Sequence, residues 1–387
     1  MENFEEKACL CALGKIFGFK PKIAHALIEH LGSARNVFKI GRQDLELLLG
    51  PHSQYIDVIR KSAVYEAADE LEQYAKLDIT YIGWTEEEYP GMLKECPDAP
   101  VGLYIRSRTH PSKLWPERRV AVVGTRDISP YGKEWCTKCV RALASTGEKP
   151  LIVSGLALGT DICAHKAALE AGLPTVAVMA TGPENVYPYR HRGFADEMCQ
   201  IPGCALVTDY PPGTAPLAVH FVRRNRIIAG LSEATVLIES KIRGGGMTTA
   251  RLAFSYDRDV YALPGRVDDV RSQGCNLLIR SKVAEPLTSV PEFLDSLGMK
   301  AENSAAPVTD REMLEQTYRS SAPADRVDQM ARLLTIIRKK RGITIEELAD
   351  LSSLGYARTV ELTSRLETDG FICTDLLQRC SINPAKR

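Results

Sequence analysis

Hydrophobic positions follow different patterns along the chain. Over residues 1 to about 75 they recur at helical spacing, without the alternation typical of strands. From about residue 78, short continuous apolar runs alternate with helix-length segments, and helical spacing returns near residue 326. A polar stretch rich in Ala, Ser and Pro lies between the last two regions. We therefore predict a helical domain at 1–77, an α/β domain at 78–299, a linker at 300–325 and a smaller domain at 326–387.

Gly18 and Pro21 form a turn between two helical stretches of the first domain. Two helices joined in this way are typical of helix-hairpin-helix or SAM-like domains. Some such modules hold a DNA backbone through the hairpin amides, and many only contact other proteins. For this domain we favour the contact role.

The second domain contains five apolar runs that end in glycine-containing or polar loops. They lie at 119–123, 151–153, 175–179, 234–238 and 259–263. Such runs, separated by helices, are typical of a parallel sheet covered on both faces. The predicted fold class is thus α/β with an extended Rossmann-like parallel sheet, and a ligand is expected at the carboxyl ends of its strands.

The last domain shows helical spacing over 329–340, a second helix from 343 and a third over 359–368, followed by a short strand at 370–373. This order is the outline of a winged helix. A winged helix is compatible with DNA binding and equally with protein contacts.

Composition and charge limit how the protein could bind nucleic acid and where it is expected to be located. Lys and Arg together number 49, as do Asp and Glu, so any nucleic-acid binding must come from a local basic patch. No apolar run approaches the roughly 18 residues of a membrane span, and the acidic start lacks the basic residues of a secretory signal, so a cytoplasmic location is expected. The cysteines are scattered and expected to be free thiols; Cys136 and Cys139 have metal-like spacing, but no second pair follows, and we predict no metal site.

Several loops at the predicted strand ends suit an anion. Gly124 and Arg126 follow the first strand, where backbone amides and a guanidinium can meet a phosphate. Ser154 and Gly155 follow the second strand; Asp161 behind them suits a helix N-cap, and His165 suits a structural hydrogen bond.

Three further segments add basic, aromatic and glycine residues. Arg190 and Arg192 alternate with aromatic residues, a combination that holds single strands without reading sequence. The segment 224–226, Arg-Asn-Arg, enters an apolar helix, where its charges need an anion or carboxylates. The glycines of 244–246 precede Thr248 and offer backbone donors. Together the loops indicate a phosphate-lined groove.

The α/β domain resembles the DNA-processing A (DprA/Smf) family from about residue 80 to 295. The string RNRIIAGLS at 224–232 is highly specific. The other matching positions, in unbroken order, are VAVVGTR from 120, VSGLA from 153, Asp161, His165, YP from 187, DYPPG from 209, LPG from 263 and GCNLLI from 274. The flanking domains resemble the family's optional SAM-like and winged-helix additions more loosely.

The resemblance implies cooperative, sequence-independent binding of single-stranded DNA, dimerisation through the Rossmann-like domain, and handover of DNA to RecA in DNA uptake, natural transformation and recombination. It implies neither catalysis nor a cofactor. This chain departs from the family after Tyr187-Pro188, where Arg190 or Arg192 would replace a basic residue, and at 244–247, where glycines replace serine hydroxyls. The predicted DNA-binding set is Gly124, Arg126, Ser154, Gly155, Arg190, Arg192, Arg224, Asn225, Arg226, Gly245, Gly246 and Thr248.

Two alternatives remain open. Nucleotide phosphoribohydrolases of the cytokinin-activating (LOG) type share this fold and have a glutamate shortly after a Gly-Gly-x-Thr loop. Here Thr248 is followed by Thr-Ala-Arg-Leu, so the acid that would promote glycosidic cleavage is absent. The other alternative is a scaffold whose outer domains bind proteins, which requires that single-stranded DNA does not bind.

Overall fold

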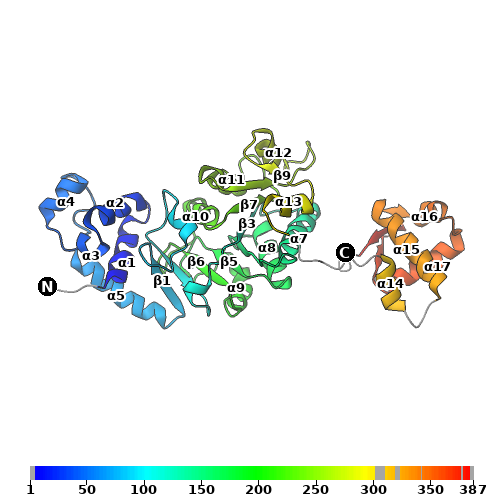
Figure 1. Ribbon diagram of the computed structural model, residues 1–387, viewed down its shortest axis with the longest axis horizontal. Coiled ribbons are helices and arrows are strands. Elements are labelled where there is room, and N and C mark those ends of the chain that lie inside the picture. Colours follow the sequence, from blue (N-terminus) through cyan, green and yellow to red (C-terminus); the bar gives the residue numbers. More distant parts are fainter. Residues whose placement is uncertain (1–4, 301–309, 319–322, 341, 376–377, 384–387) are drawn as a thin grey trace. The chain divides into compact units, whose positions relative to one another are not determined.

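The computed structural model describes residues 5–300, 310–318, 323–340, 342–375 and 378–383. The chain divides into two compact units, Met1–Glu302 and Asn303–Arg387 (Figure 1). The predicted boundary between residues 77 and 78 therefore falls inside the first unit.

A mixed sheet forms the centre of the first unit. Its strands among the described residues are β1 (Ile79–Gly83), β2 (Gly102–Arg106), β3 (Arg119–Val123), β4 (Leu151–Ser154), β5 (Thr175–Val178), β6 (Ala205–Thr208), β7 (Ala234–Leu237), β8 (Asp259–Ala262) and β9 (Glu285–Pro286). Their order is β1-β2-β6-β5-β4-β3-β7-β8-β9. Pairing is parallel from β6 to β9, whereas β1 and β2 add to that sheet antiparallel. The predicted α/β class with a Rossmann-like core is confirmed.

Helices cover both faces of the sheet. Successive strand residues point to opposite sides, and because the residues on both sides are apolar, each face needs a helical layer to bury it. Ala121 and Val123 pack into the core under one helical layer, and Val120 and Val122 pack into the core under the other. The first layer contains α6 (Gly91–Lys94), α10 (Ala218–Leu231), α11 (Gly245–Ser255) and α12 (Gln273–Arg280). The second contains α7 (Pro130–Ala144), α8 (Thr160–Glu170), α9 (Arg192–Met198) and α13 (Val290–Ser296).

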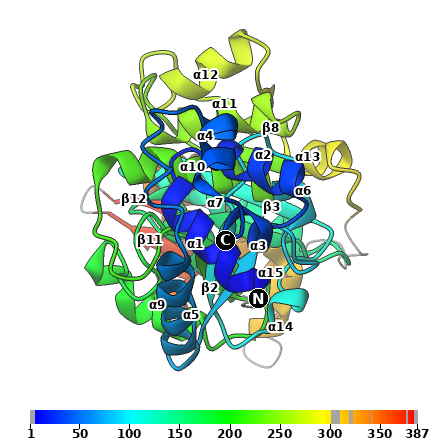
Figure 2. The same cartoon turned by 90° about the vertical axis from the view of Figure 1, so that its left-hand side faces the viewer.

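The N-terminal helices pack against the antiparallel edge of the same sheet (Figure 2). They are α1 (Glu6–Phe17), α2 (Pro21–Leu31), α3 (Ala34–Val37), α4 (Arg42–Leu49) and α5 (Lys61–Ala75). Leu10 and Leu13 of α1 share one buried cluster with Ile79, Tyr81 and Tyr104 of β1 and β2. This shared core makes the helices and the sheet one unit. The predicted turn between the first two helices is confirmed, since α1 ends at Phe17 and α2 begins at Pro21.

The second unit is a helical bundle with a small sheet. It contains α14 (Asp310–Tyr318), α15 (Ala324–Lys339), β10 (Ile343–Thr344), α16 (Ile345–Ser352), α17 (Tyr356–Thr368), β11 (Ile372–Thr374) and β12 (Arg379–Ile382). The strands pair in the order β10-β12-β11. The predicted helices and strand are present in the predicted order, while the name winged helix stays a prediction.

Helix α14 lies inside the range predicted as a linker. Leu314 and Tyr318, four residues apart and therefore on one helix face, are both buried in the core of the second unit. Burial of these two side chains stabilises a helix that the polar sequence around them does not predict. The other predicted linker residues lie mostly outside the described ones.

Candidate nucleic-acid interface

A cavity of about 540 Å³ opens at the carboxyl ends of β3 and β7. The loops after these strands contribute Gly124 and Ser240 to the lining, and the first turns of α8 and α11 lie beside them. Helix α10 lines the cavity along most of its length, from Ala218 to Ile228. This is the position at which parallel sheets of this class bind ligands. The sheet topology thus places a cavity where the sequence predicts the groove.

Two closely packed glycines make part of the cavity wall from backbone atoms. A Cβ atom on Gly124 would lie 2.4 Å from Oγ1 of Thr160, and one on Gly246 would lie 3.2 Å from the Cα atom of Gly124. Neither position has room for a side chain. The wall formed by these loops is therefore backbone, which can approach a phosphate closely.

Arg224 supplies a buried positive charge beside this wall. Its side chain donates hydrogen bonds to the carbonyl oxygens of Gly155 and Val178. Burial lowers the pKa of Arg224 to about 10, although the neighbouring Asp161 carboxylate acts in the opposite direction. The arginine therefore stays protonated at neutral pH.

Asp161 does not cap α8, contrary to the sequence prediction. The N-cap is Gly159, and a carboxylate oxygen of Asp161 instead accepts hydrogen bonds from the amides of Gly155 (3.1 Å) and Ala157 (3.3 Å). Burial raises the pKa of Asp161, and these amides and the Arg224 charge act against that rise. The carboxylate fixes the loop after β4 and partly balances Arg224.

Aromatic rings and exposed cations form the rim of the cavity. The guanidinium carbon of Arg126 lies 5.4 Å from the ring centroid of Phe221. The rings of Phe221 and Tyr187 are 5.3 Å apart, and Tyr187 is 45% exposed. Lys241 is a further exposed cation at this rim. The rim thus offers positive charge for phosphates and ring faces for bases.

Half of the predicted DNA-binding residues line the cavity. These are Gly124, Arg126, Arg224, Asn225, Gly245 and Gly246. Phe221 and Lys241 line it as well but are absent from the predicted set. Phe221 lies four residues before Asn225 and so shares its helix face, a spacing that could have identified it.

The other predicted residues lie outside the cavity lining. The buried Ser154 hydroxyl donates to the carbonyl oxygen of Val122 (2.6 Å), and Gly155 contributes through its backbone contact with Arg224. Arg190 is exposed in the short 3-10 helix Tyr189–His191 that leads into α9. Arg192 lies 3.8 Å from Asp196, and Thr248 is half-buried next to Thr249, which lines the cavity instead. Their DNA-binding role stays a prediction.

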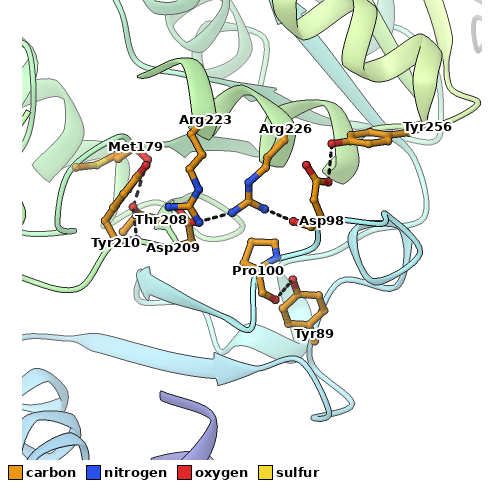
Figure 3. A network of polar contacts seen from close by, with 10 residues as sticks. All are labelled: Tyr89, Asp98, Pro100, Met179, Thr208, Asp209, Tyr210, Arg223, Arg226 and Tyr256. Atoms are coloured by element: carbon orange, nitrogen blue, oxygen red, sulfur yellow. Dashed lines mark hydrogen bonds and ion pairs between the residues drawn. The ribbon is translucent and has the colours of Figure 1, made fainter. Parts of the chain in front are cut away.

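Arg226 belongs to a separate buried network (Figure 3). Its guanidinium donates to a carboxylate oxygen of Asp209 (2.5 Å) and to the carbonyl oxygen of Asp98 (2.5 Å). Arg223 also donates to Asp209 (3.0 Å), and the Tyr256 hydroxyl donates to the Asp98 carboxylate (2.7 Å). The network joins α10 to the end of β6 and to the loop after α6. In this structure Arg226 fixes the helix that carries Arg224 and Asn225.

His165 has the structural surroundings that its position in the sequence predicts. It is buried, and its Nδ1 atom lies 2.7 Å from Oγ1 of Thr175. Burial lowers its pKa to about 3, and the charges of Arg224 and His191 act in the same direction. The imidazole is therefore neutral at physiological pH.

The paired cysteines are buried in α7. Burial raises the pKa of the Cys139 thiol to about 12, and the pKa of Cys136 is raised mainly by its contact with Cys163. In the part of the chain that the structure describes, no group of three His, Cys, Asp or Glu side chains is placed to bind a metal ion. The helices described there also lack the length and apolar character needed to span a membrane.

Curated relatives resemble this chain over its α/β region or beyond. Protein Smf of Escherichia coli is 38% identical over 54% of this chain, which spans about half of that relative's length (54%). Protein Smf of Synechocystis is 30% identical over 88% of this chain and 83% of the relative. The DNA processing protein DprA of Streptococcus pneumoniae is 35% identical over 61% of this chain and 83% of the relative.

Two solved structures are also similar to this chain. The X-ray structure of DprA from Streptococcus pneumoniae superposes with a TM-score of 0.61 at 31% identity, covering 73% of this chain and 95% of that one. DNA processing protein A from Helicobacter pylori, described by its single-stranded DNA binding mode, has a TM-score of 0.50 at 28% identity, covering 57% and 95%. Residues 80–298 match the family described as DNA recombination-mediator protein A. This chain belongs to that family.

Proposed function

We propose that the protein binds single-stranded DNA without sequence preference, with the cavity as its principal contact. The observation that carries the proposal is the combination within one cavity of a glycine backbone wall, the Arg126 and Arg224 charges, and the Phe221 and Tyr187 rings. Backbone and guanidinium groups suit phosphates, and the rings suit bases of any identity. The Helicobacter pylori relative's single-stranded DNA binding supports the same ligand class.

A salt titration with fluorescent oligonucleotides tests this function. Single strands of unrelated sequence should bind with similar affinity and more tightly than the matching duplex. Affinity should fall as salt rises, because binding releases counterions from the phosphates. Tight, sequence-specific duplex binding with little affinity for single strands would contradict the proposal.

We infer that the cavity does not cleave nucleotides. Among the described residues that line it, Asp161 is the only carboxylate, and its hydrogen bonds to the amides of Gly155 and Ala157 hold it in a structural role. No acid follows Thr248 where the LOG-type reaction would need one. Incubation with nucleoside monophosphates or ATP should release neither base nor phosphate above background. Turnover that disappears in Thr248→Ala would overturn this inference and favour the enzyme.

We further propose a role in recombination during DNA uptake, in which a homodimer formed through the Rossmann-like domain hands single strands to RecA. Membership of a recombination-mediator family supports this role. The measurement is the rate at which RecA forms filaments on strands already covered by a single-strand-binding protein. A rate unchanged by this protein would remove the handover from the proposal while leaving DNA binding intact.

A further inference from the structure

An exposed aromatic ring lies at the tip of the turn between α1 and α2. Phe19 is 62% exposed, although it belongs to a turn whose neighbours Phe17 and Pro21 are buried. The guanidinium carbon of Arg223 lies 4.4 Å from the Phe19 ring centroid. Exposed phenylalanine costs free energy in water, and here one of its faces is already engaged by a cation.

Arg223 is itself fixed in place. Its guanidinium lies 5.4 Å from the ring centroid of Tyr210 and donates to Asp209 at 3.0 Å (Figure 3). Asp209 is in turn bound by the buried Arg226. The N-terminal turn is thus attached to α10, the helix that also lines the cavity. The Phe19 ring is oriented by the partly buried Arg223, which the buried Asp209 holds in place.

Exposed apolar side chains lie at the N-cap and in the first turns of α10, the helix that contacts Phe19 and lines the cavity. Leu217, Val219 and Val222 are 53%, 55% and 58% exposed, and Val222 lines the cavity. We call these three residues and Phe19 the apolar ridge. The ring of Phe19 lies 6.1 Å from that of His220, which precedes Arg224 by about one helical turn, or roughly 5.4 Å. Val222 is the member of the apolar ridge that lines the cavity, so the ridge meets the rim of the cavity at this residue.

Cations are exposed at both ends of the apolar ridge. Lys20 and Lys22 lie on the Phe19 side, and Arg126 and Lys241 lie on the cavity side. A strip that is apolar between two positive ends matches a single strand, whose bases offer apolar faces and whose phosphates offer negative charge. A purely apolar partner would make no use of these charges.

We propose that the apolar ridge binds the nucleotides adjoining those in the cavity, with Phe19 as a platform on which a base stacks. This inference rests on the proposed function. It gives the N-terminal helices a direct part in DNA binding, in place of the protein-contact role that the sequence favours.

The test compares full-length Phe19→Ala with the unchanged protein on oligonucleotides of two lengths. The short strand has about 4 nucleotides, the lower end of the site sizes of single-strand-binding domains, and the long one about 20, which exceeds their upper end. We expect the short strand to occupy the cavity and the long strand to extend onto the ridge. Phe19→Ala should weaken binding of the long strand about five- to 100-fold, the range for loss of one stacked base, and leave the short strand unchanged. Phe19→Trp should retain affinity, and its added fluorescence should be quenched by the long strand only. Leu47→Ala is the matched control, because Leu47 is an 85% exposed apolar residue of α4 in the same helical region.

Each outcome decides the proposal. Unchanged long-strand affinity in Phe19→Ala, or an equal loss for both lengths, overturns it. A changed oligomeric state with unchanged DNA affinity overturns it in favour of a contact between copies. Arg126→Ala separates the two proposals: if that variant binds both lengths normally while Phe19→Ala loses the long strand, the cavity assignment fails and the apolar ridge stands.

Discussion

Replacing Arg126 by alanine should weaken single-strand binding about tenfold to 100-fold, which corresponds to roughly 1.5–3 kcal/mol for one charge-assisted contact. Arg126 is exposed at the rim, and its guanidinium lies against the Phe221 ring beside a wall of backbone donors. Its side chain can therefore meet the same phosphate as the glycine loop. Fluorescence anisotropy at one fixed salt concentration measures the loss.

The informative comparison is a variant that neutralises the denser basic run at 338–341. In that run Arg338 forms an ion pair with Asp310 at 2.8 Å, and Lys340 forms one with Glu347 at 3.1 Å. Because carboxylates already partner two of these charges, neutralising the run should change affinity only modestly. Arg341 lies outside the described residues. If the run proves more important than Arg126 in folded variants, the second unit binds the DNA and the cavity assignment is wrong.

Replacing Asp209 by alanine should destabilise the first unit by about 3–5 kcal/mol, the usual cost of removing one partner from a buried ion pair. The side chains of Asp209 and Arg226 are 4% and 6% exposed, so the remaining guanidinium would have no access to bulk water. Arg223 would lose the same carboxylate. Urea unfolding of the full-length protein, followed by circular dichroism, measures the change in the free energy of unfolding.

A matched control for Asp209 is Asp268→Ala, which removes an ion pair with Arg266 whose side chains are 72% and 81% exposed. Solvent screens that pair, so stability should barely change. Equal stability of the two variants would show that the network in Figure 3 contributes little to the fold.

Sequence patterns identified five of the parallel strands, β3, β4, β5, β7 and β8, because each is a largely continuous apolar run, which is the signature of burial on both faces. The short parallel strand β9 (Glu285–Pro286) has no such run. The patterns did not identify β1 and β2, which join the sheet antiparallel. The run around β6 does carry an apolar signal, in Ala205-Leu206-Val207, and could have been recognised. Whether an edge segment forms a strand depends on the elements that pack against it. For β1 and β2 these elements are the N-terminal helices, which the local sequence pattern does not reveal.

In the candidate site, too, residues placed by the local sequence could be predicted, and residues placed by contacts with distant segments could not. Gly124 and Arg126 follow a strand directly, so strand position alone predicts their place at the carboxyl edge. Arg226 shares a motif with Arg224 but faces Asp209 and Asp98, which come from distant segments. Arginines two positions apart on a helix point in different directions, and only the tertiary partners decide which of them reaches the cavity.

The N-terminal helices and the strands β1 and β2 share one buried core. This common core limits which related chains could lack the helices. Ile79, Tyr81 and Tyr104 are covered by those helices and would meet water without them. A related chain that begins directly at the sheet would need polar side chains at the equivalent positions, or another element in the place of the helices. Loss or gain of the helical segment is thus tied to simultaneous change on one strand face, which makes the segment difficult to exchange as an independent module.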